Sequence, residues 1–391
     1  MKEGWEYKKL GEVCRIERGG SPRPIKDFIT NSPDGLNWIK IGDTDPQGKY
    51  IYSTKEKIKP EGLKKSRWVE VDEFLLSNSM SFGRPYILKT NGCIHDGWLV
   101  LRDYQKSLII DYFYYLLISP HVQNQFRTKA QGSTVSNLNT DRVADVNIAF
   151  PSLSEQQRIV DYLDSAFAKI EAMKANAEKS LNEAKALFQA SLKEMLEPKE
   201  GWEEKKMSSL YDVRDGTHDS PKYQDKGYPL VTSKNLKGGI LDMSNVNFIS
   251  ESDYKAINSR SKVDIGDVLF AMIGTIGNPV YVEEEPNYAI KNMALFKVPR
   301  EQSGEFLRYY LLNNIILSKM QSEAKGTTQK FVSLGYLRNF LISLPPLSEQ
   351  QSIVAILDSL KSKVDRLQSN FDKISQECDA LKQAILRQVF E

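Results

Sequence analysis

The sequence predicts an α+β protein with two mixed α/β globular domains and two long antiparallel helices that pair as a coiled coil. Three observations lead to this fold class. They are an internal repeat, a long stretch without glycine or proline at the end of each half, and short β-type runs between turn residues ahead of each stretch. We expect globular domains at residues 1–151 and 198–345, and long helices at residues 152–197 and 346–391.

The internal repeat is defined by two anchors that occur once in each half. The motif Gly-Trp-Glu at 4–6 returns at 201–203, and Leu-Ser-Glu-Gln-Gln at 153–157 returns at 347–351. Between these anchors the halves share little more than a skeleton of glycines and prolines. Such self-similarity indicates one structural unit that occurs twice, with divergent surfaces.

The repeat also closes on itself. Residues 195–202 carry the first half into the second, and residues 389–391 followed by 1–5 reproduce that junction. The sequence therefore predicts a circularly closed, pseudo-twofold protein whose two ends lie close together at the surface.

The globular segments combine both kinds of secondary structure. Short apolar runs such as 74–76 and 268–270 lie between Gly, Asn, Pro and Asp residues, which is typical of strands. Helix-like runs follow at 109–118 and 304–312, and their aromatic residues are expected to pack in the core rather than to stack on a ligand.

The long helices are predicted from the absence of helix breakers. Each is about 40 residues long, which corresponds to about 60 Å at 1.5 Å per residue. We expect Ser154 and Ser348 to be N-caps, with Gln157 and Gln351 completing capping boxes.

The apolar pattern of the helices predicts that they pair. In the second helix, apolar residues recur in steps of three and four from Leu357 to Ile385, a heptad seam typical of coiled coils. The first helix has smaller residues such as Ala177 and Ala184 at several positions where the second is bulky. We therefore expect the helices to pack on each other; the alternative is two separate helices, each covering its own domain.

Composition favours a protein of the cytoplasm. The chain has 53 Lys and Arg against 51 Asp and Glu, so a surface for nucleic acid would have to be local. Its three cysteines are scattered, which favours reduced thiols over a disulfide framework. We find no signal peptide and no apolar run of about 18 residues, and we therefore expect no membrane partner.

Catalytic motifs are not evident. The three histidines have no partners at metal-ligand spacing, and no phosphate-binding loop is present, so we expect no metal site and no catalytic residue. Residues 278–281 (Asn-Pro-Val-Tyr) are similar to the Asn-Pro-Pro-Tyr loop of adenine methyltransferases, but the second proline is missing and residues 84–87 of the first half differ. A turn after a buried strand explains this segment better.

Taken together, two divergent domains, each followed by a helix with a Leu-Ser-Glu-Gln-Gln start, resemble the specificity subunit of type I restriction–modification systems over essentially the whole chain. The resemblance implies two target recognition domains that each read half of an asymmetric bipartite site in double-stranded DNA, and helices that set the spacer. It implies a non-catalytic subunit. Two modification subunits would bind S-adenosylmethionine and methylate adenine, and restriction subunits would use ATP and Mg to translocate and cleave DNA.

Two other function classes stay open. One is a stand-alone or fragmentary adenine-specific DNA methyltransferase, and the other is a coiled-coil adaptor with no nucleic-acid role. Binding of S-adenosylmethionine by this chain alone would favour the first, and the absence of salt-sensitive duplex binding would favour the second.

Candidate DNA-contacting residues are those in loops that correspond between the halves, although a role in turn structure or in a solvated surface is the alternative for each. These residues are Ser77, Asn78, Ser79 and Arg84 with Asn278; Ser133 and Thr134 with Thr327 and Thr328; Lys40 with Lys234; and His95 with Lys291. The lysine runs at 55–59 and 64–65 are phosphate-contact candidates, and solvated faces have the same pattern. Contacts with partner subunits are expected at the helix starts, from Glu155, Gln156, Gln157, Glu349, Gln350 and Gln351.

Overall fold

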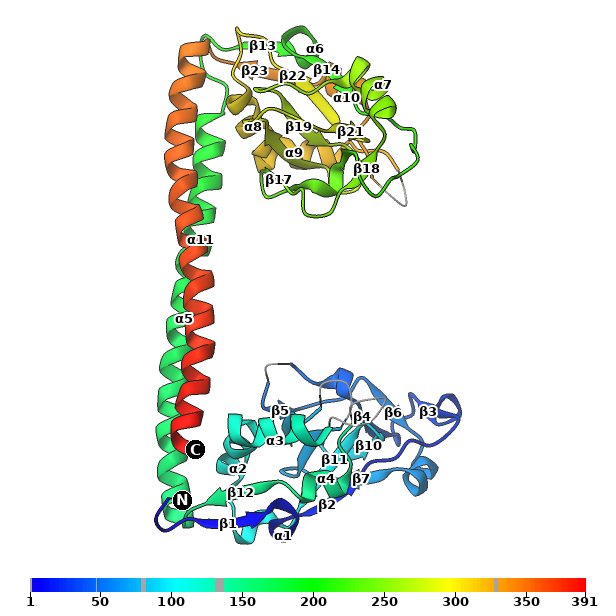
Figure 1. Cartoon of the computed structure of the whole chain (residues 1–391), viewed down its shortest axis with the longest axis vertical. Coiled ribbons are helices and arrows are strands. Elements are labelled where there is room, and N and C mark those ends of the chain that lie inside the picture. The colour runs from blue at the N-terminus through cyan, green and yellow to red at the C-terminus, as the bar shows by residue number, and fades with distance from the viewer. Residues whose placement is uncertain (1, 47, 79–81, 131–136, 327–329) are drawn as a thin grey trace. The chain divides into compact units, whose positions relative to one another are not determined.

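The structure, a computed structural model of the chain, describes residues 2–46, 48–78, 82–130, 137–326 and 330–391 (Figure 1). The chain divides into two units, residues 1–176 with 373–391 and residues 177–372. Each unit contains one globular domain and one end of a pair of long helices, α5 (Leu153–Met195) and α11 (Leu347–Phe390).

The domain of the first unit contains two five-stranded sheets, with the strand orders β2-β11-β8-β9-β5 and β3-β6-β4-β10-β7. The strands are β2 (Arg15–Arg18), β3 (Ile29–Thr30), β4 (Leu36–Ile39), β5 (Tyr50–Ile51), β6 (Glu56–Ile58), β7 (Arg67–Val69), β8 (Phe74–Ser77), β9 (Pro85–Leu88), β10 (Gly92–Ile94) and β11 (Trp98–Arg102). A separate antiparallel pair joins the domain's ends, β1 (Glu6–Lys9) with β12 (Asn147–Phe150).

Helices cover one face of the first of these sheets. They are α1 (Leu10–Val13), α2 (Ile110–Ile118), α3 (Pro120–Ala130) and α4 (Thr140–Ala144). Side chains alternate along β8, so that Phe74 and Leu76 pack against the helices while Leu75 packs against the second sheet with Ile39 and Ile94. Strand β8 is therefore buried on both faces, which explains its uninterrupted apolar sequence.

The domain of the second unit repeats this plan with fewer strands. Its sheets have the orders β14-β22-β19-β20 and β18-β15-β21, with the pairs β16-β17 and β13-β23. The strands are β13 (Glu203–Lys206), β14 (Asp212–Asp215), β15 (Tyr228–Thr232), β16 (Leu236–Lys237), β17 (Ile240–Leu241), β18 (Asn247–Ile249), β19 (Val268–Ala271), β20 (Gly277–Tyr281), β21 (Ala289–Lys291), β22 (Ala294–Lys297) and β23 (Leu341–Leu344). The helices are α6 (Met207–Leu210), α7 (Glu251–Ser261), α8 (Gly304–Leu312), α9 (Asn314–Ser322) and α10 (Leu334–Asn339).

Each domain is completed by the end of a long helix that arrives from the other half of the sequence. In the first unit, Leu386 and Phe390 of α11 are buried in the core, and the Phe390 ring lies 5.5 Å from that of Tyr112. Lys2 Nζ donates a hydrogen bond of 2.5 Å to the carbonyl of Val389, so the chain ends lie together as predicted. In the second unit, Leu192 and other residues near the end of α5 are buried in the corresponding way.

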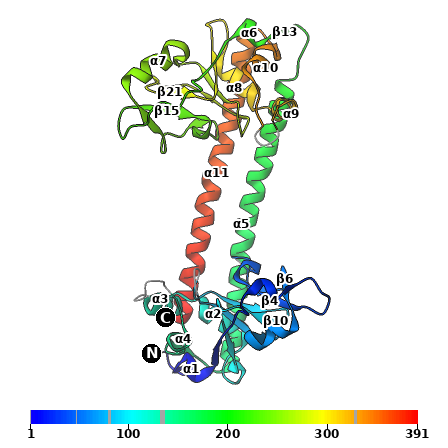
Figure 2. The ribbon, with the colours of Figure 1, turned by 90° about the vertical axis from the view of Figure 1, so that its right-hand side faces the viewer.

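The helix pair is antiparallel, as predicted. In the first unit, Glu171 and Lys174 on α5 pair with Lys382 and Asp379 on α11, so residue numbers rise on one helix as they fall on the other. In the second unit, Lys185 Nζ donates to Gln368 Oε1 at 2.8 Å. Within each unit, Figures 1 and 2 show the two helix segments side by side.

Two details of the helices differ from the prediction. Both helices begin before Ser154 and Ser348, so the predicted capping boxes are wrong. The N–H groups of Gln156 and Gln350 are satisfied by the carbonyls of residues 152 and 346 instead. In the heptad seam, Leu357 and Cys378 are buried, but Leu381 is 47% exposed.

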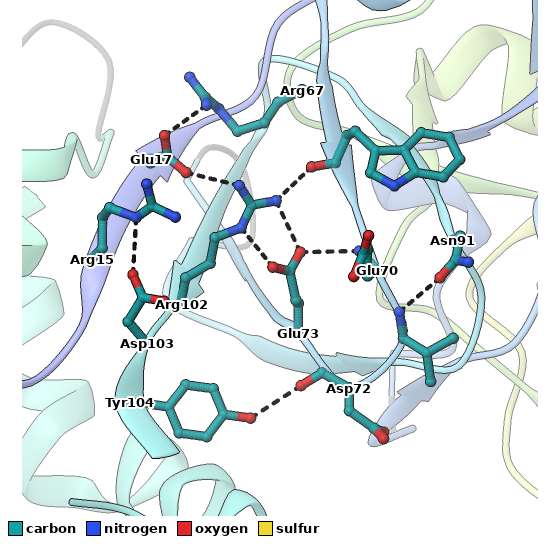
Figure 3. A network of polar contacts seen from close by, with 12 residues as sticks. Arg15, Glu17, Arg67, Glu70, Asp72, Glu73, Asn91, Arg102, Asp103 and Tyr104 are labelled. Carbon is teal, nitrogen blue, oxygen red and sulfur yellow. Dashed lines mark hydrogen bonds and ion pairs between the residues drawn. The ribbon is translucent and has the colours of Figure 1, made fainter. Parts of the chain in front are cut away.

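A largely buried cation holds neighbouring segments together in each domain. In the first, the Arg102 guanidinium lies between Glu17, at 2.9 Å, and Glu73, at 2.6 Å (Figure 3). It also donates to the carbonyl of Trp68, and Glu17 is shared with Arg67. These contacts tie together β2, β7, β11 and the turn before β8.

The second domain has a lysine at the corresponding place. Lys297 Nζ lies 2.5 Å from a carboxylate oxygen of Asp264 and 2.5 Å from one of Asp267.

None of the helices in the described ranges combines the length and the apolar character that a membrane span requires.

Candidate nucleic-acid interface

Three predicted residues of the first domain converge on the turn between β10 and β11. Asn78 N–H donates to the carbonyl of Gly97 at 3.0 Å, and its Nδ2 donates to that of Asp96 at 2.9 Å. His95 Nδ1 accepts from the N–H of Gly97 at 2.6 Å, and Nε2 lies 3.2 Å from the N–H of Ile41, the residue after Lys40. The structure therefore brings Lys40, Asn78 and His95 to one group of loops.

Most of these side chains serve the domain itself. Asn78 is 1% and Ser77 is 2% exposed, and Asn78 holds the turn between β10 and β11, so contact of these two residues with DNA stays a prediction. Ser77 Oγ accepts from the N–H of Arg84 at 3.0 Å. Burial lowers the pKa of His95, so its imidazole is neutral near pH 7. Its position is that of a bridge between two backbone turns.

Arg84 is more exposed than Ser77 and Asn78. It is partly exposed, and its Cζ lies 5.5 Å from the centre of the Tyr86 ring. In the second domain, Asn278 takes its place after Gly277, with a φ of 49°. The segment of Asn278 lies within β20 instead of forming the predicted turn, since Leu269 and Val280 are cross-strand partners.

The register of β4 with β10 and of β15 with β21 corrects one predicted correspondence between residues of the two halves. Ile39 lies beside Ile94 as Val231 lies beside Ile290. Lys40 therefore corresponds to Thr232 rather than to Lys234, and the predicted match is wrong by two residues. His95 does correspond to Lys291, as predicted.

The two predicted lysines that were matched with each other have different surroundings. Lys40 Nζ forms an ion pair of 2.6 Å with Glu56. Lys234 is exposed on a 3-10 turn (Ser233–Asn235) and forms no ion pair with any residue that the structure describes. Lys291 is 8% exposed, and its Nζ donates to Ser220 Oγ at 2.7 Å. Of these residues, Lys234 offers the most accessible charge.

An exposed histidine of the second domain was missed from the sequence. His218 Nδ1 lies 2.8 Å from Asn292 Oδ1, and Nε2 lies 2.8 Å from Asp215 Oδ2. Hydrogen bonds to Asn292 and Asp215 raise the pKa of His218, which favours its charged form. At the corresponding position of the first domain, the neutral hydroxyl of Ser21 donates a hydrogen bond of 2.7 Å to Asp96 Oδ1. Only the strand register shows that these positions correspond.

The second group of predicted loop residues, Ser133, Thr134, Thr327 and Thr328, lies outside the described residues, as does Ser79. The residues that flank these loops correspond between the domains. Leu138 N–H donates to the carbonyl of Asn78 at 2.9 Å, and Val332 N–H donates to that of Met272 at 3.0 Å. In each domain a residue shortly before the last short helix is therefore bonded to the residue that follows the central strand.

The helix starts contradict one part of the predicted partner interface. Gln156 is fully buried; its Oε1 accepts from the N–H of Ile109 at 2.9 Å and its Nε2 donates to the carbonyl of Ser107 at 2.8 Å. Gln350 is 1% exposed and accepts in the same way from the N–H of Ser303 at 3.0 Å. Because these amides hold the helices to their domains, they are not available to a partner.

The other residues of this predicted interface lie nearer the surface. Gln157 and Gln351 are exposed, and Glu155 is partly exposed. Glu349 Oε1 accepts from Trp202 Nε1 at 3.3 Å, which links the two repeated motifs of the second half. Contact of these four residues with a partner stays a prediction.

A tyrosine–aspartate hydrogen bond that occurs once in each half was not predicted from the sequence. The Tyr115 hydroxyl donates to Asp164, and the Tyr309 hydroxyl donates to Asp358 at 2.5 Å. Both pairs are separated by 49 residues, a regularity that the sequence contains but that attracts no attention without the structure. Each pair fixes a helix of the globular domain to the first part of a long helix.

Among the described residues, no group of three or more His, Cys, Asp or Glu side chains is placed to hold a metal ion. The site in each domain is thus a set of loops with hydrogen-bonding and charged groups that differ between the domains. Such groups can bind base edges and phosphates.

The sequence matches the family described as the type I restriction modification DNA specificity domain twice, over residues 2–183 and 199–374. The chain belongs to this family. It is 20% identical over 418 residues to the EcoKI specificity subunit of Escherichia coli K12, covering 100% of this chain and 89% of that protein. It is 22% identical over 410 residues to the MjaIX specificity subunit of Methanocaldococcus jannaschii, covering 97% and 92%.

Solved structures share the fold. A chain from a study of complex assembly and conformational transition of the type I restriction–modification system matches with a TM-score of 0.77 and 22% identity, over 100% of this chain and 98% of that one. The HsdS subunit of Thermoanaerobacter tengcongensis matches with a TM-score of 0.58 and 20% identity, over 100% and 97%. The fold class predicted from the sequence is confirmed.

Proposed function

We propose that this specificity subunit reads an asymmetric bipartite sequence in double-stranded DNA, each globular domain binding one half. One observation carries the proposal: two domains of the same plan present different side chains at corresponding loop positions. Arg84 of the first domain corresponds to Asn278 of the second, and Ser21 corresponds to His218. Different donors and acceptors select different bases, so the two half-sites differ.

Residues with accessible polar groups are the best candidates for these contacts. Arg84 can donate two parallel hydrogen bonds to guanine, and Asn278 can bind adenine through its amide. Lys234 and a charged His218 suit phosphate oxygens. The loop residues outside the described ranges remain predicted contacts.

We infer that the chain is not itself catalytic and that two modification subunits bind to its helices. Large apolar side chains are exposed at corresponding places of α5 and α11. Tyr162 and Ile356 are 52% and 48% exposed, and Leu187 and Leu381 are 63% and 47% exposed. Exposed apolar residues that recur in both halves fit a partner that binds twice.

The remaining chemistry is assigned to the partners. The modification subunits would bind S-adenosylmethionine and methylate an adenine extruded from the stack, and the restriction subunits would use ATP and Mg to translocate and cleave DNA. The cytoplasm remains the predicted location. If the purified chain alone bound S-adenosylmethionine, the methyltransferase alternative would replace this assignment.

The helices are proposed to set the spacer between the half-sites. A helix of 43 or 44 residues is about 65 Å long. Insertion of seven residues into both helices keeps the heptad register and should change the number of unread base pairs without changing either half-site.

Methylome sequencing of cells that express the chain with its modification subunits tests the proposal. We expect methylated adenines in a split motif. Arg84→Gln should alter one half of the motif, and Asn278→Ala should alter the other. If either substitution changed both halves, or if no split motif appeared, the assignment of one half-site to each domain would be wrong.

A further inference from the structure

The sheet β3-β6-β4-β10-β7 of the first domain carries three lysines at alternating positions along one extended segment. Lys55, Lys57 and Lys59 flank or belong to β6, where successive side chains point to opposite faces. Lys55 and Lys59 are exposed and Lys57 is partly exposed. Because they are two residues apart in an extended segment, the three side chains leave the backbone on the same side.

The two residues between these lysines point to the other side. Ile58 is fully buried, in a cluster that includes Trp38. Glu56, which could neutralise a neighbouring lysine, is instead paired with Lys40 at 2.6 Å. Lys40 therefore already neutralises the one carboxylate within the lysine segment.

The cross-strand neighbours make the lysine face polar. Lys57 lies opposite Thr30 of β3 and Asn37 of β4. Both are short, uncharged residues that leave room above the sheet. Neither cross-strand partner of Lys57 carries a charge that would neutralise it.

Backbone groups at the ends of the segment hold two of the lysines without neutralising them. Lys55 Nζ donates to the carbonyl of Gly42 at 2.9 Å, and Lys59 Nζ donates to that of Asp27 at 2.7 Å. None of the three lysines forms an ion pair with a residue in the described ranges, and the nearby Asp43 carboxylate accepts from the N–H groups of Lys40 and Lys55. Their charges are available to an anion.

The corresponding strand of the second domain has no such charges. Strand β18 pairs with β15 as β6 pairs with β4. Ile249 lies opposite Tyr228 in the second domain, and Ile58 lies opposite Leu36 in the first. Phe248 therefore corresponds to Lys57. Val246 and Ser250 then correspond to Lys55 and Lys59. The stripe is a property of the first domain.

We propose that Lys55, Lys57 and Lys59 form a phosphate-binding stripe for the DNA backbone next to the half-site of the first domain, a contact that the second domain lacks. The inference rests on the proposed function. Lys55 and Lys59 are about 13 Å apart along the strand, which matches about four base-pair steps of 3.4 Å each. The stripe positions the duplex and carries no sequence information.

Salt dependence of binding measures the contact directly. The assay uses the full chain with its modification subunits and a duplex that contains the methylated motif, titrated between 50 and 200 mM KCl. Each phosphate contact contributes about 0.9 to the slope of log K against log salt. Changing all three lysines to glutamine should lower the magnitude of the slope by about 2.7, and each single change by about 0.9.

Two matched variants control for net charge and for folding. Replacing Lys237, Lys255 and Lys262 by glutamine removes three charges from the second domain, but these lysines are already paired with Asp242, Glu251 and Asp264. We expect that slope to change by less than about 0.5. Replacing the three stripe lysines by arginine keeps the charges and should keep the wild-type slope.

The outcomes separate this inference from the proposed function. If the wild-type complex bound duplexes without salt sensitivity or sequence preference, the proposed function itself would be wrong. If wild-type binding were steeply salt-dependent and the glutamine triple variant kept the same slope, the stripe would be refuted while the function stood. A variant that altered the methylated motif would likewise contradict a backbone contact.

Discussion

The two globular domains neutralise an inward-facing carboxylate at the same place in the fold with different cations. Each has a tight turn before its central strand, and a carboxylate of that turn faces inward: Glu73 in the first domain and Asp267 in the second. The first domain neutralises it with Arg102, which also reaches Glu17, and the second uses Lys297 with Asp264. In both domains a cation neutralises the inward-facing carboxylate, and the guanidinium of Arg102 reaches a second strand that the single ammonium group of Lys297 does not.

Removal of the buried cation should have the largest effect. Arg102→Met leaves Glu73 without a cation and Lys297→Met leaves Asp267 without one, so we expect a loss of about 3 kcal/mol in the stability of the affected domain. Hydrogen exchange followed separately in peptides of each domain measures this. Adding Glu73→Gln to Arg102→Met should recover part of the loss. Equal destabilisation of both domains by either single change would refute the local role of the pair.

The buried glutamines at the helix starts should come next. Gln156→Ala and Gln350→Ala leave buried backbone groups without hydrogen bonds, which costs about 2 kcal/mol in each domain. The exposed neighbours provide controls: Gln157→Ala and Gln351→Ala should change stability by less than about 0.5 kcal/mol. Denaturant unfolding of the four variants compares them. If the exposed changes were the more harmful pair, the assignment of buried and exposed amides would be wrong.

The repeated tyrosine–aspartate contact should show a smaller and unequal effect. Tyr115→Phe removes the hydroxyl that binds Asp164, with an expected loss of about 1.5 kcal/mol. Tyr309→Phe should cost less, because Arg308 remains 3.1 Å from Asp358. Thermal unfolding of both variants tests the order, and a larger loss for Tyr309→Phe would contradict it.

The smallest expected effect is that of pH: acidification should lower the stability of the first domain and raise that of the second. Burial lowers the pKa of His95, so below about pH 6.5 the unfolded chain takes up a proton that the folded first domain does not, and that domain loses stability. Hydrogen bonds to Asn292 and Asp215 raise the pKa of His218. The second domain therefore has this stabilisation below about pH 6.5 and loses it as the pH rises through the raised pKa.

Variants assign these pH effects to the two histidines. Hydrogen exchange of each domain between pH 5.5 and 8, corrected for the intrinsic exchange rate, should show the opposite trends in the wild type. His95→Gln should remove the acid sensitivity of the first domain, and His218→Gln should remove the gain of the second. Parallel trends in both domains of the wild type would refute the contrast.

The candidate site was less predictable than the fold. The repeat located the loops, and the match of His95 with Lys291 is confirmed by strand register. The match of Lys40 with Lys234 failed because a count along the chain cannot detect which strand residues are neighbours. Asn78, chosen as a DNA contact, is a buried residue that holds a turn. Polar residue types in a loop do not reveal whether their hydrogen bonds are made within the protein.

The sequence by itself determined the duplication, the two long helices, their antiparallel pairing and the meeting of the chain ends. These features follow from spacing and periodicity, which are properties of a linear pattern. Only the tertiary structure decided that Gln156 is buried while Gln157 is exposed, and that Glu56 pairs with Lys40 rather than with a lysine beside it in sequence. Burial and charge pairing depend on which distant segments meet, and that is settled when the elements pack.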